Sequence, residues 1–178
     1  MVFSKGYDLK RLPYDLKPVH FMVGRWKLIG IRGIAEQLKP PDVMDFSINP
    51  IPMFGARVLN LTANYVDHEN PNRIRMTMYG FVPVKNATVR DPRIHTALIS
   101  TYSTGFNTIE QGMVYPGRLI RYHLKQFMRR SFGLSDYDFT ISKMKREFKV
   151  EGNRMTMKVE TQTDAGDDIY NAGYWRIE

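Results

Sequence analysis

Gly24-Arg25-Trp26 near the start of the chain and Tyr174-Trp175-Arg176 near its end decide the fold. A glycine two residues before a tryptophan lets the backbone turn tightly into a first strand. The indole then closes one end of a small β-barrel, and a cation on the last strand can lie across its face. The sequence therefore predicts a barrel with Trp26 in its floor, and barrels of this kind enclose cavities that hold ligands.

Ten segments between and around these stretches have the alternation and the flanking turn residues of strands. They are expected over residues 26–36, 42–49, 57–66, 73–82, 94–102, 106–114, 118–127, 137–150, 154–163 and 168–177. In the segment 137–150 the apolar phase slips, which predicts a β-bulge near Ser142-Lys143. The predicted fold class is all-β: a ten-stranded up-and-down antiparallel β-barrel of the calycin type.

The segment from Arg118 to Arg130 also fits a basic amphipathic helix of the kind that binds membranes or nucleic acids. Its apolar residues do not form a clean helical stripe, however, and Pro116-Gly117 just before it is typical of a hairpin turn. A strand is therefore favoured here.

The chain is predicted to divide into a flexible N-terminal arm over residues 1–17 and one barrel domain over residues 18–178. Pro13 interrupts any regular element in the arm. Residues 18–23 are expected to form a short helical turn that lids one end of the barrel, with Pro18 at its start.

Composition limits the partners and the compartment. The 178 residues include no cysteine, which excludes a disulfide framework and thiolate chemistry. No secretory signal and no membrane span are recognisable, so a cytoplasmic or nuclear protein is expected. The net charge of +8 favours an anionic partner such as nucleic acid, acidic lipid or a carboxylate ligand. The positive charges are dispersed along the chain, so an ordinary basic surface is the simpler interpretation of the net charge. Whether the protein forms a homo-oligomer is left open by the sequence.

No residue pattern indicates catalysis. The four histidines are not spaced as metal ligands, and no nucleophile elbow, P-loop or dinucleotide fingerprint is present. His95 and His123 lie on expected strands and are candidates to point into a cavity. The eleven methionines indicate either a lipophilic pocket wall or an ordinary barrel core.

Several short stretches, in this order, resemble the nitrobindin family of heme-binding, lipocalin-like ten-stranded barrels. They are Phe21–Trp26, Pro41, Phe54–Tyr65, Tyr79–Val82, Thr104-Gly105, Met128-Arg129 and Lys145–Phe148. The resemblance spans roughly residues 18 to 177. It implies a ferric heme b held by one axial histidine on the last strand, with activity on nitric oxide and peroxynitrite.

The chain departs from the family pattern at the positions that would hold the heme. The axial histidine position falls on Ile169, and the heme-contacting threonine position falls on Leu38. The glycine motif keeps Gly24, Trp26 and Gly30 but has Leu28 in place of its middle glycine. An aliphatic side chain cannot ligate iron. Tyr170, one step along the strand, is expected to face the opposite side.

Three functions remain open from the sequence. The first is a non-enzymatic barrel for a hydrophobic small molecule, either lipid-like or a tetrapyrrole, with Arg121 or Arg146 as candidates to neutralise a ligand carboxylate. The second is a heme protein with His95 or His123 as a non-standard ligand. The third is a ligand-free barrel that acts as a protein or nucleic-acid interaction module. The replacement of the heme-holding residues by Leu38 and Ile169 favours the first.

Overall fold

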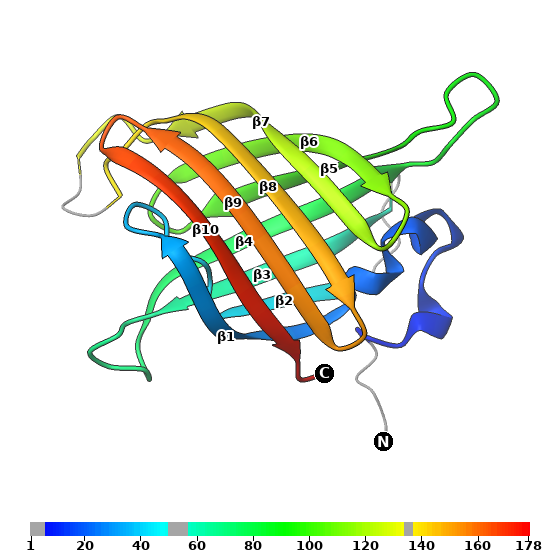
Figure 1. Ribbon diagram of the computed structural model, residues 1–178, viewed down its shortest axis with the longest axis horizontal. Coiled ribbons are helices and arrows are strands. Elements are labelled where there is room, and N and C mark those ends of the chain that lie inside the picture. Colours follow the sequence, from blue (N-terminus) through cyan, green and yellow to red (C-terminus); the bar gives the residue numbers. More distant parts are fainter. Residues whose placement is uncertain (1–5, 50–56, 134–136) are drawn as a thin grey trace.

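The computed structural model describes residues 6–49, 57–133 and 137–178, and its ten antiparallel strands form one closed barrel (Figure 1). Neighbouring strands in the sequence are neighbours in the barrel, and β1 closes the ring by pairing with β10. The predicted fold class is thus confirmed. Residues 1–5 of the predicted arm and Phe54–Ala56 of the stretch used for the resemblance lie outside the described residues.

The element bounds lie close to those expected from the sequence. The strands are β1 Gly24–Ile34, β2 Val43–Ile48, β3 Val58–Val66, β4 Ile74–Lys85, β5 Ile94–Tyr102, β6 Phe106–Tyr115, β7 Leu119–Arg129, β8 Ile141–Glu151, β9 Arg154–Thr163 and β10 Gly166–Arg176. Two 3₁₀ helices precede them, η1 Leu9–Arg11 and η2 Tyr14–Met22. β7 confirms the choice of a strand over an amphipathic helix, and the register shift between Ile141 and Lys143 confirms the predicted bulge.

Period-two alternation decides which side chains face the interior. In β3 the residues Leu59, Leu61, Ala63 and Tyr65 are buried, while the polar residues between them are partly exposed. Successive side chains of a strand point to opposite faces, so β3 lies in the barrel wall with its apolar face toward the interior. The same rule places Met155 and Met157 of β9 inside.

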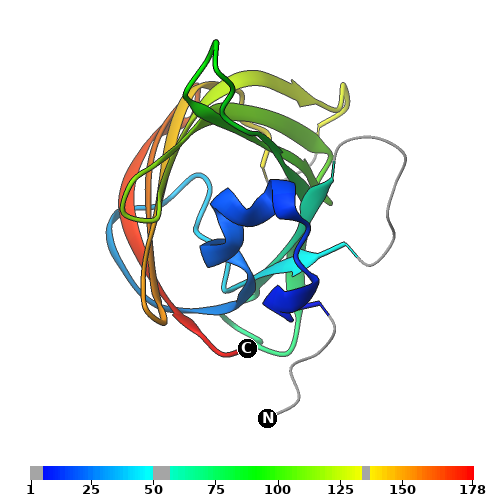
Figure 2. The same cartoon turned by 90° about the vertical axis from the view of Figure 1, so that its right-hand side faces the viewer.

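The helix η2 closes one end of the barrel (Figure 2). Its residues Leu16, Val19 and Met22 are buried. The predicted helical turn is confirmed in kind, but it begins earlier, at Tyr14, and has 3₁₀ geometry with Pro18 inside it.

Gly6 and Tyr7 of the predicted arm contact β2 in the structure. The hydroxyl of Tyr7 donates a hydrogen bond to the carboxylate of Asp45 on β2, and the amide of Ile48 donates to the Gly6 carbonyl. Burial, together with Asp45, raises the pKa of Tyr7. The flexibility of the arm and the boundary at residue 17 stay predictions.

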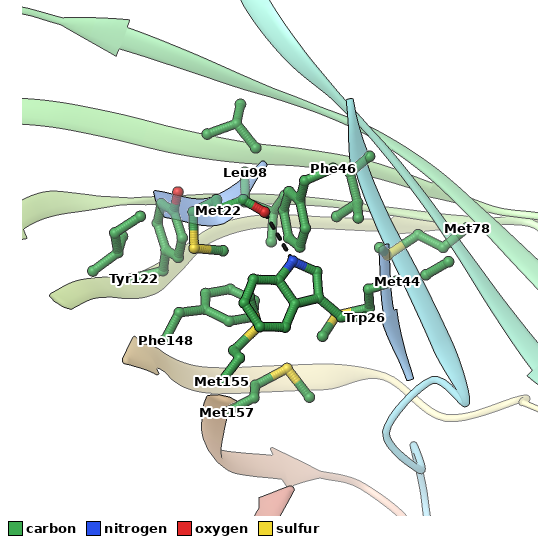
Figure 3. Packing of buried hydrophobic residues seen from close by; sticks show 14 of the residues in the cluster. Met22, Trp26, Met44, Phe46, Met78, Leu98, Tyr122, Phe148, Met155 and Met157 are labelled. Carbon is green, nitrogen blue, oxygen red and sulfur yellow. Dashed lines mark hydrogen bonds between the residues drawn. The ribbon is translucent and has the colours of Figure 1, made fainter. Parts of the chain in front are cut away.

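Trp26 is fully buried at the closed end, among methionine and phenylalanine side chains (Figure 3). Its Nε1 donates a hydrogen bond of 2.9 Å to the carbonyl of Met22 in η2. Phe148 lies edge-on to Phe46, with the ring centres 6.0 Å apart. This end of the barrel is therefore a packed apolar floor, as the sequence predicts.

Candidate functional site

Above the floor, the inward face of the barrel carries a buried pair of opposite charges. Glu110 of β6 is 0% exposed and Arg146 of β8 is 6% exposed. Each occupies an inward position of an alternating strand: Glu110 follows Phe106 and Thr108, and Arg146 precedes Phe148. The alternation of two otherwise ordinary strands thus brings opposite charges together inside the barrel.

The two charges form an ion pair. Arg146 Nε donates to Glu110 Oε1 over 2.9 Å, while Nη1 lies 3.3 Å from the sulfur of Met157 and Nη2 lies 3.7 Å from that of Met144. Burial disfavours the charged guanidinium, but Glu110, Tyr102 and Tyr170 together outweigh burial and raise the pKa of Arg146. Arg146 therefore keeps its charge inside the barrel, beside the carboxyl group of Glu110.

Four side-chain oxygen atoms on the inward faces of β5 and β6 have no hydrogen-bond partner within the described residues. They are Glu110 Oε2, Ser100 Oγ, Thr108 Oγ1 and the hydroxyl oxygen of Tyr102. Ser100 and Thr108 face each other across the β5–β6 ladder, and Glu110 follows two residues later on the same face. Unpaired buried polar atoms are rare in proteins and indicate a site for a ligand or an ordered water molecule.

The absence of a side chain at Gly80 lets the backbone of β4 approach these atoms closely. Gly80 of β4 is buried and pairs with Ser100, which in turn pairs with Thr108. A Cβ atom built at Gly80 would lie 2.8 Å from the Ile99 carbonyl and 3.4 Å from Ser100 Oγ. We call Gly80, Ser100, Thr108, Glu110 and Arg146 the interior polar site.

Tyrosine rings border the interior polar site. Tyr65, Tyr102 and Tyr170 are all buried, and each interacts electrostatically with Arg146. Burial raises the pKa of all three phenols above the usual range. The phenols are therefore neutral at physiological pH and line the site as hydrogen-bonding groups without charge.

The carboxylate of Asp168 anchors the loop between β1 and β2. Asp168 is 0% exposed and accepts hydrogen bonds of 2.8 to 3.1 Å from the backbone amides of Glu36, Gln37 and Leu38. Leu38 occupies the position of the family threonine, and this hydrogen bond to its amide helps to keep it buried. Asp168 is therefore a buried carboxylate with backbone partners, whereas its neighbour Asp167 is exposed.

The structure reverses the faces expected for Ile169 and Tyr170. Ile169 is 59% exposed on the outside of β10 and pairs with the equally exposed Ile34, whereas Tyr170 is buried inside. Ile169 therefore does not line the interior of the barrel, although the resemblance placed the heme ligand at this position. The inward phase of β10 consists of Asp168, Tyr170, Ala172 and Tyr174.

Two glycines of the predicted site lie on β1. Gly24 has a φ of 142°, and a Cβ atom there would lie 2.7 Å from the Glu178 carbonyl. Only glycine combines this conformation with such a close approach. Gly30 is exposed at a register shift against β10, and Leu28 just before it is half-buried.

None of the four histidines faces the interior. His20, His68 and His123 are exposed, and His95 contacts Asp91 through a 2.8 Å hydrogen bond from its Nε2. Hydrogen bonds from Arg93 and His95 hold the pKa of Asp91 well below its usual range. The interior residues therefore do not fit a heme held by an imidazole. Within the described ranges, no group of His, Asp and Glu side chains is arranged to hold a metal ion.

His123 and Ile169, both exposed, line one cavity of about 380 Å³. Its lining also includes the buried residues Met144, Thr161 and Asp168. Arg121 also lies outside, where its Nε contacts Glu147 Oε2 at 2.7 Å. Arg121 is therefore not available to a ligand inside the barrel.

Sequence reasoning missed Glu110, Ser100, Thr108 and Gly80. The available signal was a charged residue on the inward phase of an alternating strand, which Arg146 and Glu110 both show. Two such residues of opposite charge predict a buried pair, since a lone buried charge is too costly.

Comparisons with known proteins support the fold. No family model matches the chain, and no curated protein matches it. The crystal structure of Rv2717c from M. tuberculosis is similar, with a TM-score of 0.66 over 94% of this chain and 99% of that one. The two sequences are 15% identical, so the likeness concerns the fold alone. Among the described residues, no helix is long and apolar enough to cross a membrane.

Proposed function

We propose that this barrel holds a small, largely apolar molecule in its interior, with the polar group of the ligand in the interior polar site. The observation that carries the proposal is the group of unpaired buried oxygens Glu110 Oε2, Ser100 Oγ and Thr108 Oγ1, which lie close together on the inward faces of β5 and β6. Each unpaired buried polar group costs roughly 1–3 kcal/mol, so a bound molecule that satisfies them gains binding energy.

The surroundings favour an apolar, lipid-like body for this ligand. Met144 and Met157 flank Arg146, and Leu61 pairs with Gly80 on the neighbouring strand. Methionine side chains adapt their shape to irregular apolar ligands. The proposal does not include a heme held by His95 or His123, because both imidazoles lie on the outside of the barrel.

Binding of the neutral dye Nile red, followed by its fluorescence, tests the proposal. Saturable binding with a fluorescence increase is expected, and native mass spectrometry of the purified protein is expected to detect a co-purified small molecule. The double variant Ser100→Leu/Thr108→Leu fills the interior polar site and is expected to weaken dye binding about tenfold or more, or 1.4 kcal/mol.

The matched control is Thr101→Leu/Asn107→Leu. These two residues pair with each other on the outer face of the same two strands, one position away from the inner pair. The control variant should bind the dye as the parent chain does. Equal binding by the filled variant, or its failure to fold because the interior has no room, would overturn the proposal.

A further inference from the structure

The interior polar site also constrains the chemistry of the ligand's polar group, an inference that rests on the proposed function. The first constraint is charge. Glu110 already neutralises Arg146 at a contact of 2.9 Å, and both side chains are withdrawn from water. A ligand carboxylate would leave two negative charges facing one positive charge in a region of low dielectric, where uncompensated charge is costly.

The second constraint is hydrogen bonding. Glu110 Oε2 is a carboxylate oxygen, which only accepts, so its missing partner must be a donor. Two hydrogen bonds from the Nη atoms of Arg146 go to the thioether sulfurs of Met157 and Met144, which are weak acceptors, so these atoms can still donate to an oxygen. The site therefore matches a group that both donates and accepts.

The hydroxyl groups of Ser100 and Thr108 fit the same requirement. A hydroxyl can rotate and act as donor or acceptor, so these two side chains complete the contacts of a small neutral group. An ammonium group would also donate to Glu110, but it would place a second positive charge beside Arg146.

We propose that the ligand carries an uncharged hydrogen-bonding group, an alcohol or an amide, which donates to Glu110 Oε2 and accepts from Arg146. The site thus selects a neutral head group over a carboxylate or an ammonium group. In this proposal Arg146 donates to a neutral group, which replaces the role expected from the sequence, in which Arg146 neutralises a ligand carboxylate.

Displacement of Nile red by three compounds with the same chain length tests the inference: decan-1-ol, decanoate and decylammonium, at neutral pH. The alcohol is expected to bind about tenfold more tightly than either ion, a difference of 1.4 kcal/mol. Glu110→Gln leaves Arg146 without its counter-charge, so this variant should bind decanoate more tightly than decan-1-ol. The outer-face variant Thr101→Leu/Asn107→Leu should keep the parent order.

A second variant covers the case in which Glu110→Gln does not fold. Glu110→Leu/Arg146→Met replaces the pair with apolar residues, and the preference for decan-1-ol over decanoate is expected to disappear there. Tighter or equal binding of either ion by the parent chain would overturn the inference while leaving the proposed function intact. An absence of dye binding by the parent chain would instead overturn the proposed function, and the inference with it.

Discussion

The guanidinium carbon of Arg176 lies 4.4 Å from the centre of the Trp26 ring, and Arg176 Nη2 donates a 2.9 Å hydrogen bond to the Phe21 carbonyl. One side chain of the last strand thus joins the first strand and the helix η2. Burial lowers the pKa of Arg176, and the contact with the indole face compensates part of that cost.

Arg176→Met retains most of the apolar length of the side chain but removes the charge and the donor. The free energy of unfolding is expected to fall by about 2–3 kcal/mol, the sum of a desolvated cation–π contact and one hydrogen bond. Urea unfolding followed by circular dichroism measures it. Arg32→Met, on the exposed part of β1, is the control and should change little. Similar losses in both variants would contradict a special role for the Trp26 contact.

The buried pair is expected to be strongly non-additive. Arg146→Met leaves Glu110 unpaired, and Glu110→Leu leaves Arg146 unpaired, so each single variant should lose roughly 3–5 kcal/mol of stability. The double variant replaces both with apolar side chains and should be close to the parent chain. A double-mutant cycle in urea measures the coupling. Additive losses would show that the two side chains act independently.

Asp168 is expected to control the order of the loop after β1. Asp168→Ala removes the acceptor of three backbone amides, so stability should fall by roughly 2–3 kcal/mol, as for hydrogen bonds to a charged group. Hydrogen exchange at Glu36, Gln37 and Leu38 should accelerate. Asp167→Ala is the matched control, because Asp167 is the exposed neighbour on the same strand. Unchanged exchange in Asp168→Ala would contradict the anchoring role.

Stability is expected to fall at alkaline pH because the interior phenols resist ionisation. Burial raises the pKa of Tyr122 and Tyr170 above the value of about 10 that tyrosine has in an unfolded chain. Below a pH of about 10, these phenols are protonated in both the folded and the unfolded state, so their contribution to the free energy of unfolding is complete. Above it only the unfolded state loses protons, so the free energy of unfolding declines as the pH rises.

Urea unfolding at a series of pH values from neutral to strongly alkaline tests this dependence. Tyr170→Phe should make the alkaline decline shallower, since one resistant phenol is removed. Tyr14→Phe alters a tyrosine that is 79% exposed and should leave the decline as it is. An identical decline in all three proteins would assign the effect to other groups.

Alternation made most of the barrel predictable from the sequence. The bounds of β5 and β9 were predicted to the residue, and burial in β3 and β9 follows the period-two alternation of their sequences. These strands place apolar residues on one phase and polar residues on the other, so burial selects a single register. Short turns then leave few alternatives to antiparallel pairing of neighbours.

The last strand shows why the candidate site was harder to predict. β10 carries large apolar residues on both phases, Ile169 and Trp175 on one, Tyr170 and Tyr174 on the other. Hydrophobicity alone therefore does not decide which phase faces inward. The deciding features are distant in sequence: Asp168 binds the loop at Gln37, and the Tyr174 hydroxyl donates to the Pro41 carbonyl.

The interior polar site was missed for a related reason. The expectation that charged side chains face the solvent is correct for most lysines and arginines of this chain. It fails for Glu110 and Arg146, because their opposite charges pair inside the barrel. Glu110 and Arg146 are 36 residues apart, and only the lateral order β6–β7–β8 brings them together.

The pairing of Trp26 with Arg176 across β1 and β10 has a consequence for folding kinetics. Contacts between residues so remote in sequence raise the relative contact order, which slows folding. Until β10 docks, β1 and β9 each present an unpaired edge on which other chains can add, so aggregation competes with ring closure. Refolding yield should therefore depend on protein concentration, and the decisive event should be the docking of the final strand.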